Sequence, residues 1–456
     1  MKFCKYLILL VFYVFLVNFS YADEFSSLLN QRREHISFFL YDIESNRVIS
    51  SYKDNRPLKP ASLLKILTSF AALRTLGAEY TFNTKVYVEG QKGGYVDRLI
   101  IEGGGDPSLD IEELWKLARE IKKSGIQKIG TVVLDDTLYM NINKREGQRA
   151  YEARATAIAL NYNSMEFKVC PTILGKPASV TNEPFEYYVN YNGNIITDSK
   201  KHFYTIDEAK EDKLASLSNL YNLSGNIKYN APCDTFYRSV SDPLLYFTQV
   251  FYDFLNYLGI QTSKKFVASV KHNNAKLLFT HTSMPLKQIL EGLNHYSVNV
   301  TADHLVYAVG NTQMGKNFDV GLDVLNNFVR DFGCLNGCNI VDGSGLSHEN
   351  LVNARTLGNI LVSISKNPSI SIEFENSLPT LGKSGTLKNA HYLSSAVVLR
   401  AKTGTINGVR GLAGYIYSQR GRKYAFVIMQ NNVTYPNEIS LEKKLVNLIN
   451  NRINRK

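Results

Sequence analysis

The chain has 456 residues, of which 44% are hydrophobic and 20% are charged, and this balance excludes a disordered or a fibrous protein. The length allows two or three domains, each large enough to bury its own core. The formal net charge of +11 is compatible with polyanionic partners such as nucleic acid or bacterial wall polymers. The basic residues are scattered, however, and form no arm or tail, so we expect no nucleic-acid partner.

Residues 1–22 have the pattern of a secretory signal peptide. Lys2 and Lys5 precede an uninterrupted apolar run from Leu7 to Val17, and small residues then lead to a cleavage site before Asp23. The run is shorter than the roughly 20 residues that a spanning helix needs. An uncleaved anchor is the alternative. We expect an exported protein, periplasmic or associated with the cell wall, whose membrane contact is at most peripheral.

The first part of the mature chain alternates between strand and helix patterns. Two strands are predicted at 35–43 and 48–52, and a helix follows Pro60 and ends at Gly77. Residues 103–106, Gly-Gly-Gly-Asp, predict a tight turn, because no phosphate-binding GK[ST] sequence follows them. The other elements predicted before residue 227 are strands at 85–88, 98–102 and 129–134, a helix at 111–123, and a polar, β-rich module at 169–226.

Helical periodicity dominates the second part of the chain until three strands and a final helix close it. The apolar stripe of that last helix is expected to cover a sheet, with a membrane surface as the alternative. The predicted helices are 243–258, 286–293, 302–309, 320–332, 354–364 and 439–453, and the predicted strands are 397–403, 412–417 and 424–430.

Antiparallel strands at both ends of the chain, with helices between them, predict an α/β (α+β) fold built from distant segments. The expected domains are a discontinuous main domain of residues 23–80 and 238–456, an inserted α/β domain of residues 81–168 and 227–237, and a small β-rich module of residues 169–226 nested in the insertion.

Four cysteines remain after removal of the signal peptide, and an exported chain allows them to form disulfides. Cys334 and Cys338 flank a short loop whose glycine permits closure, and Cys170 and Cys233 would form the second pair. The sequence alone does not choose among the three possible pairings of the four cysteines, and it also allows free thiols. No pair of cysteines or histidines has the spacing of a zinc site, so we expect no metal and no cofactor.

Three short motifs carry the predicted chemistry. Ser62-Leu-Leu-Lys65 is an SxxK motif, Ser297-Val-Asn299 is an SxN motif, and Lys402-Thr403-Gly404-Thr405 contains a K[ST]G motif. This set is found in β-lactamases and penicillin-binding proteins. Ser62 and Lys65 fall on one face near the start of a predicted helix, where the helix dipole favours a developing anion.

Each motif alone is weak, because it recurs elsewhere in the chain. The order and context of the three motifs select the set above, although Lys383-Ser384-Gly385 is a close competitor whose role stays open. The remaining matches are SxxK at Ser50, Ser363 and Ser440, SxN at Ser224, and K[ST]G at Lys123.

With these motifs in place, the chain resembles the low-molecular-mass class C penicillin-binding proteins, which are D-alanyl-D-alanine carboxypeptidases and endopeptidases. The resemblance covers nearly the whole mature chain, and the long insertion between Ser62 and Ser297 is typical of that family. It implies a penicillin-binding, serine transpeptidase-like domain interrupted by accessory domains. Besides the motifs, it includes the segments 103–107, 159–163 and 342–347.

The resemblance implies acyl transfer by Ser62 on peptidoglycan stem peptides that end in D-Ala-D-Ala, and inhibition by β-lactams. Lys65 accepts the serine proton, and the cation of Lys402 would lower the pKa of Lys65. Ser297 relays a proton to the leaving amine, and Asn299 positions Lys65 and the substrate amide. In substrate binding, Lys402 and Thr403 hold the terminal carboxylate, and the backbone N–H groups of Ser62 and Thr405 form the oxyanion hole.

Two other functions remain open. A serine β-lactamase would need a deacylating base, and the long insertion argues against it. A non-catalytic wall-binding homologue would be expected to have lost at least one of the motif residues. Both carboxypeptidase and endopeptidase activities are compatible with the sequence.

Overall fold

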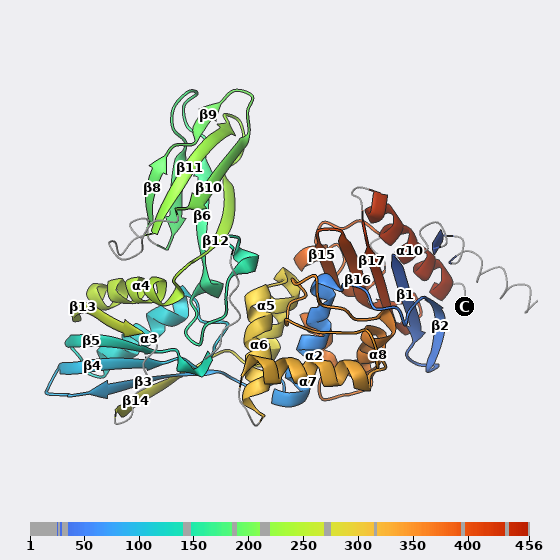
Figure 1. Cartoon of the computed structure of the whole chain (residues 1–456), viewed down its shortest axis with the longest axis horizontal. Helices are drawn as coiled ribbons and strands as arrows, with labels where there is room; N and C mark the ends of the chain where they lie inside the picture. Colours follow the sequence, from blue (N-terminus) through green and yellow to red (C-terminus); the bar gives the residue numbers. More distant parts are fainter. Residues whose placement is uncertain are drawn as a thin grey trace, which may run out of the picture. The chain divides into compact units, whose positions relative to one another are not determined.

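The computed structural model describes residues 25, 28–29, 35–139, 147–184, 189–209, 219–268, 275–313, 317–393, 397–433 and 437–454 (Figure 1). The predicted signal peptide lies outside these residues. The chain divides into two compact units. The first unit contains the chain up to Tyr80 together with residues 286–298 and 308–456, and the second contains residues 81–285 and 299–307.

The first unit is built on an antiparallel sheet in the order β15-β16-β17-β1-β2, so strands from the two ends of the chain pair directly. Each central strand is buried along most of its length, which explains its nearly continuous apolar sequence. The strands are β1 (Ile36–Asp42), β2 (Arg47–Tyr52), β15 (Leu399–Ile406), β16 (Val409–Tyr417) and β17 (Lys423–Asn431).

Helices cover both faces of this sheet (Figure 1). On one face, the apolar stripe of α10 (Asn437–Asn454), including Leu445 and Ile449, packs in a common core with Phe38 and Phe426 of the strands. The prediction that the last helix covers a sheet is therefore confirmed. On the other face, α8 (Ala354–Ser365) contacts β1, β16 and β17.

Helix α2 (Leu64–Leu76) is preceded by a single 3-10 turn, η1 (Ala61–Leu63), and the remaining helices of the first unit pack against α2, against one another or against the sheet. They are α5 (Leu286–Tyr296), α7 (Phe318–Asp331), α9 (Ser371–Ser377) and the short η6 (Gly385–Leu387). The helix α6 (Asn299–Asn311) begins in the second unit and ends in the first.

The second unit contains a mixed sheet in the order β13-β5-β4-β3-β14. Its apolar core is shared with α3 (Ile111–Lys123) and α4 (Pro243–Tyr257). The strands are β3 (Asn83–Glu89), β4 (Tyr95–Glu102), β5 (Lys128–Asp135), β13 (Gln261–Ala268) and β14 (Lys276–Thr282), and short 3-10 turns follow at Thr137–Tyr139, Ala150–Glu152 and Asn161–Asn163.

A β-rich module is nested in this unit and is drawn around the labels β6 and β8 to β12 in Figure 1. Its two sheets have the orders β12-β6-β7 and β10-β11-β8, and β9 also pairs with β11. The strands are β6 (Ser164–Cys170), β7 (Ser179–Glu183), β8 (Val189–Gly193), β9 (Ile196–Asp198), β10 (Phe203–Glu208), β11 (Asn219–Lys228) and β12 (Asp234–Ser239).

One predicted boundary is wrong. We expected the main domain to resume at residue 238, but residues up to Pro285 belong to the second unit. The reason is that β13 pairs with β5 and β14 pairs with β3, at the two edges of the second sheet. These strands are only partly buried, so their apolar pattern is too weak to predict a strand from the sequence.

The four cysteines form the disulfides Cys170–Cys233 and Cys334–Cys338. Within the described part of the chain, no helix is both long and apolar enough to cross a bilayer.

Candidate active site

Ser62 lies in the 3-10 turn that leads into α2. Its neighbours Ala61 and Leu63 are fully buried, whereas Ser62 is partly exposed, so the side chain of the serine is presented at the surface of the core. Ala61 has a left-handed backbone with φ of 48°, which is rare for a residue with a Cβ and is typical of functional turns. The start of the helix adds positive potential at this position.

Lys65 follows Ser62 by three residues, in the first turn of α2, and is fully buried. Its Nζ donates a hydrogen bond to Ser62 Oγ at 3.0 Å and another to the carbonyl oxygen of Ser344 at 2.9 Å. Burial of the aliphatic stem fixes the direction of the amine. The predicted pair of nucleophile and base is therefore in hydrogen-bond contact.

The Ser344 carbonyl is held by a loop that Asp342 organises. Asp342 Oδ1 accepts hydrogen bonds from the backbone N–H groups of Ser344 and Gly345, at 2.8 and 2.6 Å, and Oδ2 accepts one from Ser347 N at 2.8 Å. A second carbonyl of the loop, that of Gly343, accepts from Thr68 Oγ1 of α2 at 2.6 Å. The loop thus positions Lys65, a role that the sequence did not reveal.

Lys402 forms the second buried lysine contact of the first unit. Its Nζ donates to Ser297 Oγ and to the carbonyl oxygen of Thr403, both at 3.0 Å, and the residue has no exposed surface. Burial lowers the pKa of the Lys402 ammonium from its ordinary value to about 7. The lowering expected at Lys65 stays a prediction.

Two glycines let the K[ST]G strand approach the nucleophile turn. A Cβ on Gly404 would lie 2.9 Å from the carbonyl oxygen of Pro60 and 3.1 Å from Leu63, and a Cβ on Gly411, its partner on β16, would lie 2.6 Å from Leu63 Cδ1. These contacts place β15 directly against η1. The backbone N–H groups of Ser62 and Thr405, the expected oxyanion hole, come from these two adjoining segments.

The Lys383-Ser384-Gly385 match has a structural role beside the site. Ser384 Oγ accepts a hydrogen bond from Thr380 N at 3.0 Å, and a Cβ on Gly385 would meet the His295 carbonyl near the end of α5. This turn presents Thr386, whose hydroxyl lies 2.8 Å from that of Thr403. In the sequence, the only sign of the contact between Thr386 and Thr403 is that a threonine directly follows Lys383-Ser384-Gly385.

Asn299 is the first residue of α6 and belongs to the second unit. Its side-chain amide donates to the carbonyl oxygen of Tyr151 at 2.9 Å. The expected role of Asn299 toward Lys65 and the substrate amide stays a prediction.

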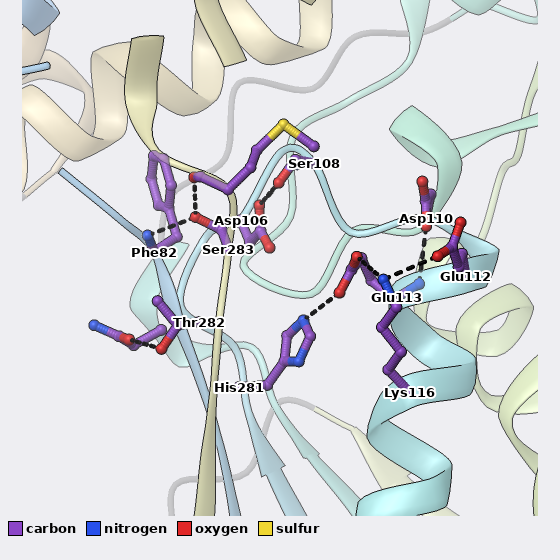
Figure 2. Close-up of polar contacts among 12 residues, drawn as sticks. Phe82, Asp106, Ser108, Asp110, Glu112, Glu113, Lys116, His281, Thr282 and Ser283 are labelled. Carbon is purple, nitrogen blue, oxygen red and sulfur yellow. Dashed lines mark hydrogen bonds and ion pairs between the residues drawn. The ribbon is translucent and has the colours of Figure 1, made fainter. Parts of the chain in front are cut away.

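The glycine-rich turn of the second unit forms a separate polar cluster, shown in Figure 2. Asp106 Oδ1 accepts from the backbone N–H and the hydroxyl of Ser108, and His281 lies 3.4 Å from Glu113. Burial raises the pKa of the Asp106 carboxyl. No group of metal-binding side chains occurs among the described residues, and the hydrogen bonds of Asp106 fit the predicted tight turn.

The geometry therefore joins the predicted residues in two contacts, Ser62 with Lys65 and Ser297 with Lys402. Thr403 gains the unpredicted partner Thr386. A buried amine against a serine hydroxyl suits nucleophilic acyl transfer.

Several known proteins are similar to this chain in sequence and in fold. The chain is 29% identical to the D-alanyl-D-alanine carboxypeptidase of an Actinomadura species, over 92% of this chain and 85% of the relative. The crystal structure of penicillin binding protein 4 from Haemophilus influenzae matches with a TM-score of 0.79 and 25% identity, over 94% of this chain and 99% of that one. A structure of the same Haemophilus protein complexed with a β-lactam matches with a TM-score of 0.76 and 26% identity, over 93% and 99% of the two chains.

The family comparison agrees with these relatives. Residues 23–452 match the D-Ala-D-Ala carboxypeptidase 3 (S13) family, which is a family of serine peptidases. The match starts directly after the predicted signal peptide and spans both units. The chain belongs to the D-Ala-D-Ala carboxypeptidase 3 (S13) family.

Proposed function

We propose that this chain is an exported D-alanyl-D-alanine carboxypeptidase that acts on peptidoglycan stem peptides through an acyl-enzyme on Ser62. The observation that supports this most is the 3.0 Å contact between the buried Lys65 amine and Ser62 Oγ. The β-lactam complex of the Haemophilus relative is in keeping with it.

In the proposed reaction, Ser62 Oγ attacks the carbonyl carbon between the two D-alanines while its proton passes to the neutral amine of Lys65. The Ser344 carbonyl oxygen orients the Lys65 amine toward the Ser62 hydroxyl, because it accepts a hydrogen bond from one of the N–H groups of the amine. The N–H groups of Ser62 and Thr405 stabilise the oxyanion, a contribution of about 3–4 kcal/mol per donor in a well-studied protease.

Release of the terminal D-alanine requires a proton at its nitrogen. Ser297 is the proposed relay for this proton, and its hydrogen bond with Lys402 supports the role. Asn299 is the proposed ligand of the substrate amide. Lys402 and Thr403 bind the terminal carboxylate of the substrate. The relayed proton is the one that Lys65 took from Ser62, so the amine of Lys65 is neutral again in the acyl-enzyme. A water molecule then attacks the ester carbonyl and gives a proton to Lys65, and this proton passes to Ser62 Oγ as the ester bond breaks, which restores the hydroxyl and the neutral amine.

The test is release of D-alanine from a pentapeptide that ends in D-Ala-D-Ala, measured with the mature chain and with Lys65→Met. Loss of the basic amine is expected to lower kcat by at least about a hundredfold, in line with general-base catalysis. Lys59→Met, which changes a partly exposed lysine three residues before Ser62, is the matched control. D-alanine release at the wild-type rate by Lys65→Met would contradict the proposal.

A further inference from the structure

The β-rich module has two ends, and the chain enters and leaves it at the same one. In the ladder between β6 and β12, Ser164 pairs with Ser239 at that end, and Val169 pairs with Asp234 at the other. The disulfide Cys170–Cys233 closes the ladder at this second end. The loops beyond the disulfide, residues 171–178, 194–203 and 229–233, are called here the loop tip, and they lie near the label β9 in Figure 1.

Backbone hydrogen bonds tie these loops into one surface. Gly175 N donates to the carbonyl oxygen of Thr197 at 2.9 Å, and Ala178 N donates to that of Ile195 at 2.7 Å. The third loop is attached through Tyr229 N, which donates to the carbonyl oxygen of Asp198 at 2.8 Å. The side chains of the loop tip are therefore presented together.

Large apolar side chains of the loop tip face outward. The exposed fractions are 73% for Ile173, 54% for Leu174, 78% for Phe203 and 59% for Tyr229. Single exposed apolar residues need no explanation, but a cluster of them on tied loops marks an interaction surface.

The charge of the same surface is positive. Lys176, Lys200 and Lys201 are exposed in the loops, and Lys228, exposed as well, ends β11 beside them. The acidic residue within the loops is Asp198, and its Oδ1 accepts from the backbone N–H groups of Lys200 and Lys201 at 2.8 and 2.7 Å. That carboxylate is thus engaged with the backbone, while the lysine side chains extend from the surface.

We propose that the loop tip binds the surface of an anionic lipid bilayer. Aliphatic and aromatic side chains enter the region between head groups and acyl chains, and lysines beside them attract anionic head groups. A glycan would stack on the rings of Phe203 and Tyr229 but leave the aliphatic Ile173 and Leu174 exposed to water, whereas the bilayer interface accepts all four side chains. The apolar stripe of α10 is not available for this purpose, because it is buried against the sheet of the first unit.

The experiment is co-sedimentation of the mature chain with vesicles of phosphatidylcholine containing about 30% phosphatidylglycerol, and with pure phosphatidylcholine vesicles. The apolar variant combines Ile173→Ser, Leu174→Ser and Phe203→Ser, and the charge variant combines Lys200→Ser and Lys201→Ser. The matched controls are Tyr257→Ser, which changes a residue that is 81% exposed on α4, and Lys443→Ser with Lys444→Ser on α10.

The wild-type chain and both controls are expected to bind the anionic vesicles, about tenfold more weakly at high salt, and both tip variants should bind at least about tenfold more weakly than wild type. Equal binding by wild type and tip variants would overturn the proposal. Tip-dependent binding to lipid-free cell walls, without binding to vesicles, would overturn it as well. The acylation rate with benzylpenicillin shows that each variant is folded and keeps a loss of vesicle binding separate from a failure of the catalytic proposal.

Discussion

Gly345 lies so close to the nucleophile turn that a Cβ on it would overlap the carbonyl oxygen of Ala61. The backbone of the Asp342 loop is therefore in direct contact with the backbone of the η1 turn. Gly345, the residue after Ser344, lies against Ala61, the residue before Ser62. Because the Ser344 carbonyl accepts the hydrogen bond of Lys65, this contact couples the position of the base to that of the nucleophile.

Replacement of Gly345 by alanine should separate these two segments. We expect Gly345→Ala to lower the rate of acylation by benzylpenicillin by about a hundredfold or more, because a displacement of about 1 Å is costly in a site that depends on orientation. The rate is measured by quenching the reaction at successive times and determining the penicilloylated fraction of the protein by intact mass.

A glycine with the same backbone conformation provides the control for this prediction. Gly345 has φ of 81° and Gly421 has φ of 80°, but a Cβ on Gly421 meets nothing within 4 Å. Both substitutions carry the strain of a left-handed alanine, about 1 kcal/mol, and only one of them creates an overlap. Equal acylation rates in the two variants would contradict the role given to the Gly345 contact.

Thr386 is expected to act as a positioning residue for Thr403. Loss of its hydroxyl in Thr386→Val removes a hydrogen bond worth about 1 kcal/mol, so kcat/KM should fall about fivefold through a higher KM, with little change in kcat. Thr386→Ser keeps the hydroxyl and should restore the wild-type KM. An equal loss in the valine and serine variants would show that the hydroxyl has no such role.

Lys402 should make the stability of the first unit depend on pH. Its pKa is about 7 in the folded protein and near 10.5 when the chain is unfolded. Below pH 7 both states hold the proton, and the folded state carries the full cost of a buried charge. Between these two values the unfolded state binds more protons, so the free energy of unfolding rises with pH.

Lys402→Met removes this dependence. The variant is expected to be more stable than wild type by a few kcal/mol at about pH 6, and the difference should shrink toward about pH 9. Urea denaturation at the two pH values measures it, with Lys443→Met on the exposed side of α10 as the control. A stability difference that does not change with pH would contradict a lowered pKa at Lys402.

The sequence predicted elements with strong periodicity well. The helix 111–123 was placed at its observed bounds, and the central strands around 412–417 and 424–430 were recognised because they are buried on both faces. β13 and β14 were missed, since edge strands with one exposed face have little apolar pattern, and the domain boundary at residue 238 was wrong for that reason.

Within the site, spacing along one helix was enough to predict the contact between Ser62 and Lys65. The contact of Lys402 with Ser297 joins residues 105 positions apart and was not predicted, because the resemblance of the motifs implied only that both residues belong to the site. The Ser344 carbonyl and the Thr386 hydroxyl could not be found in this way. The Ser344 carbonyl is a backbone group, which every residue type has, so the sequence does not mark it. The position of the Thr386 hydroxyl depends on how its loop folds against β15.

The central claim is that Ser62 is the nucleophile, and the most direct test is the intact mass of the mature chain after incubation with benzylpenicillin. The account predicts a stable penicilloyl adduct on the peptide that contains Ser62, its loss in Ser62→Ala, and its retention in Ser50→Ala, which changes another serine of SxxK spacing. An adduct that persists in Ser62→Ala, or penicillin that is consumed without any adduct, would contradict the account.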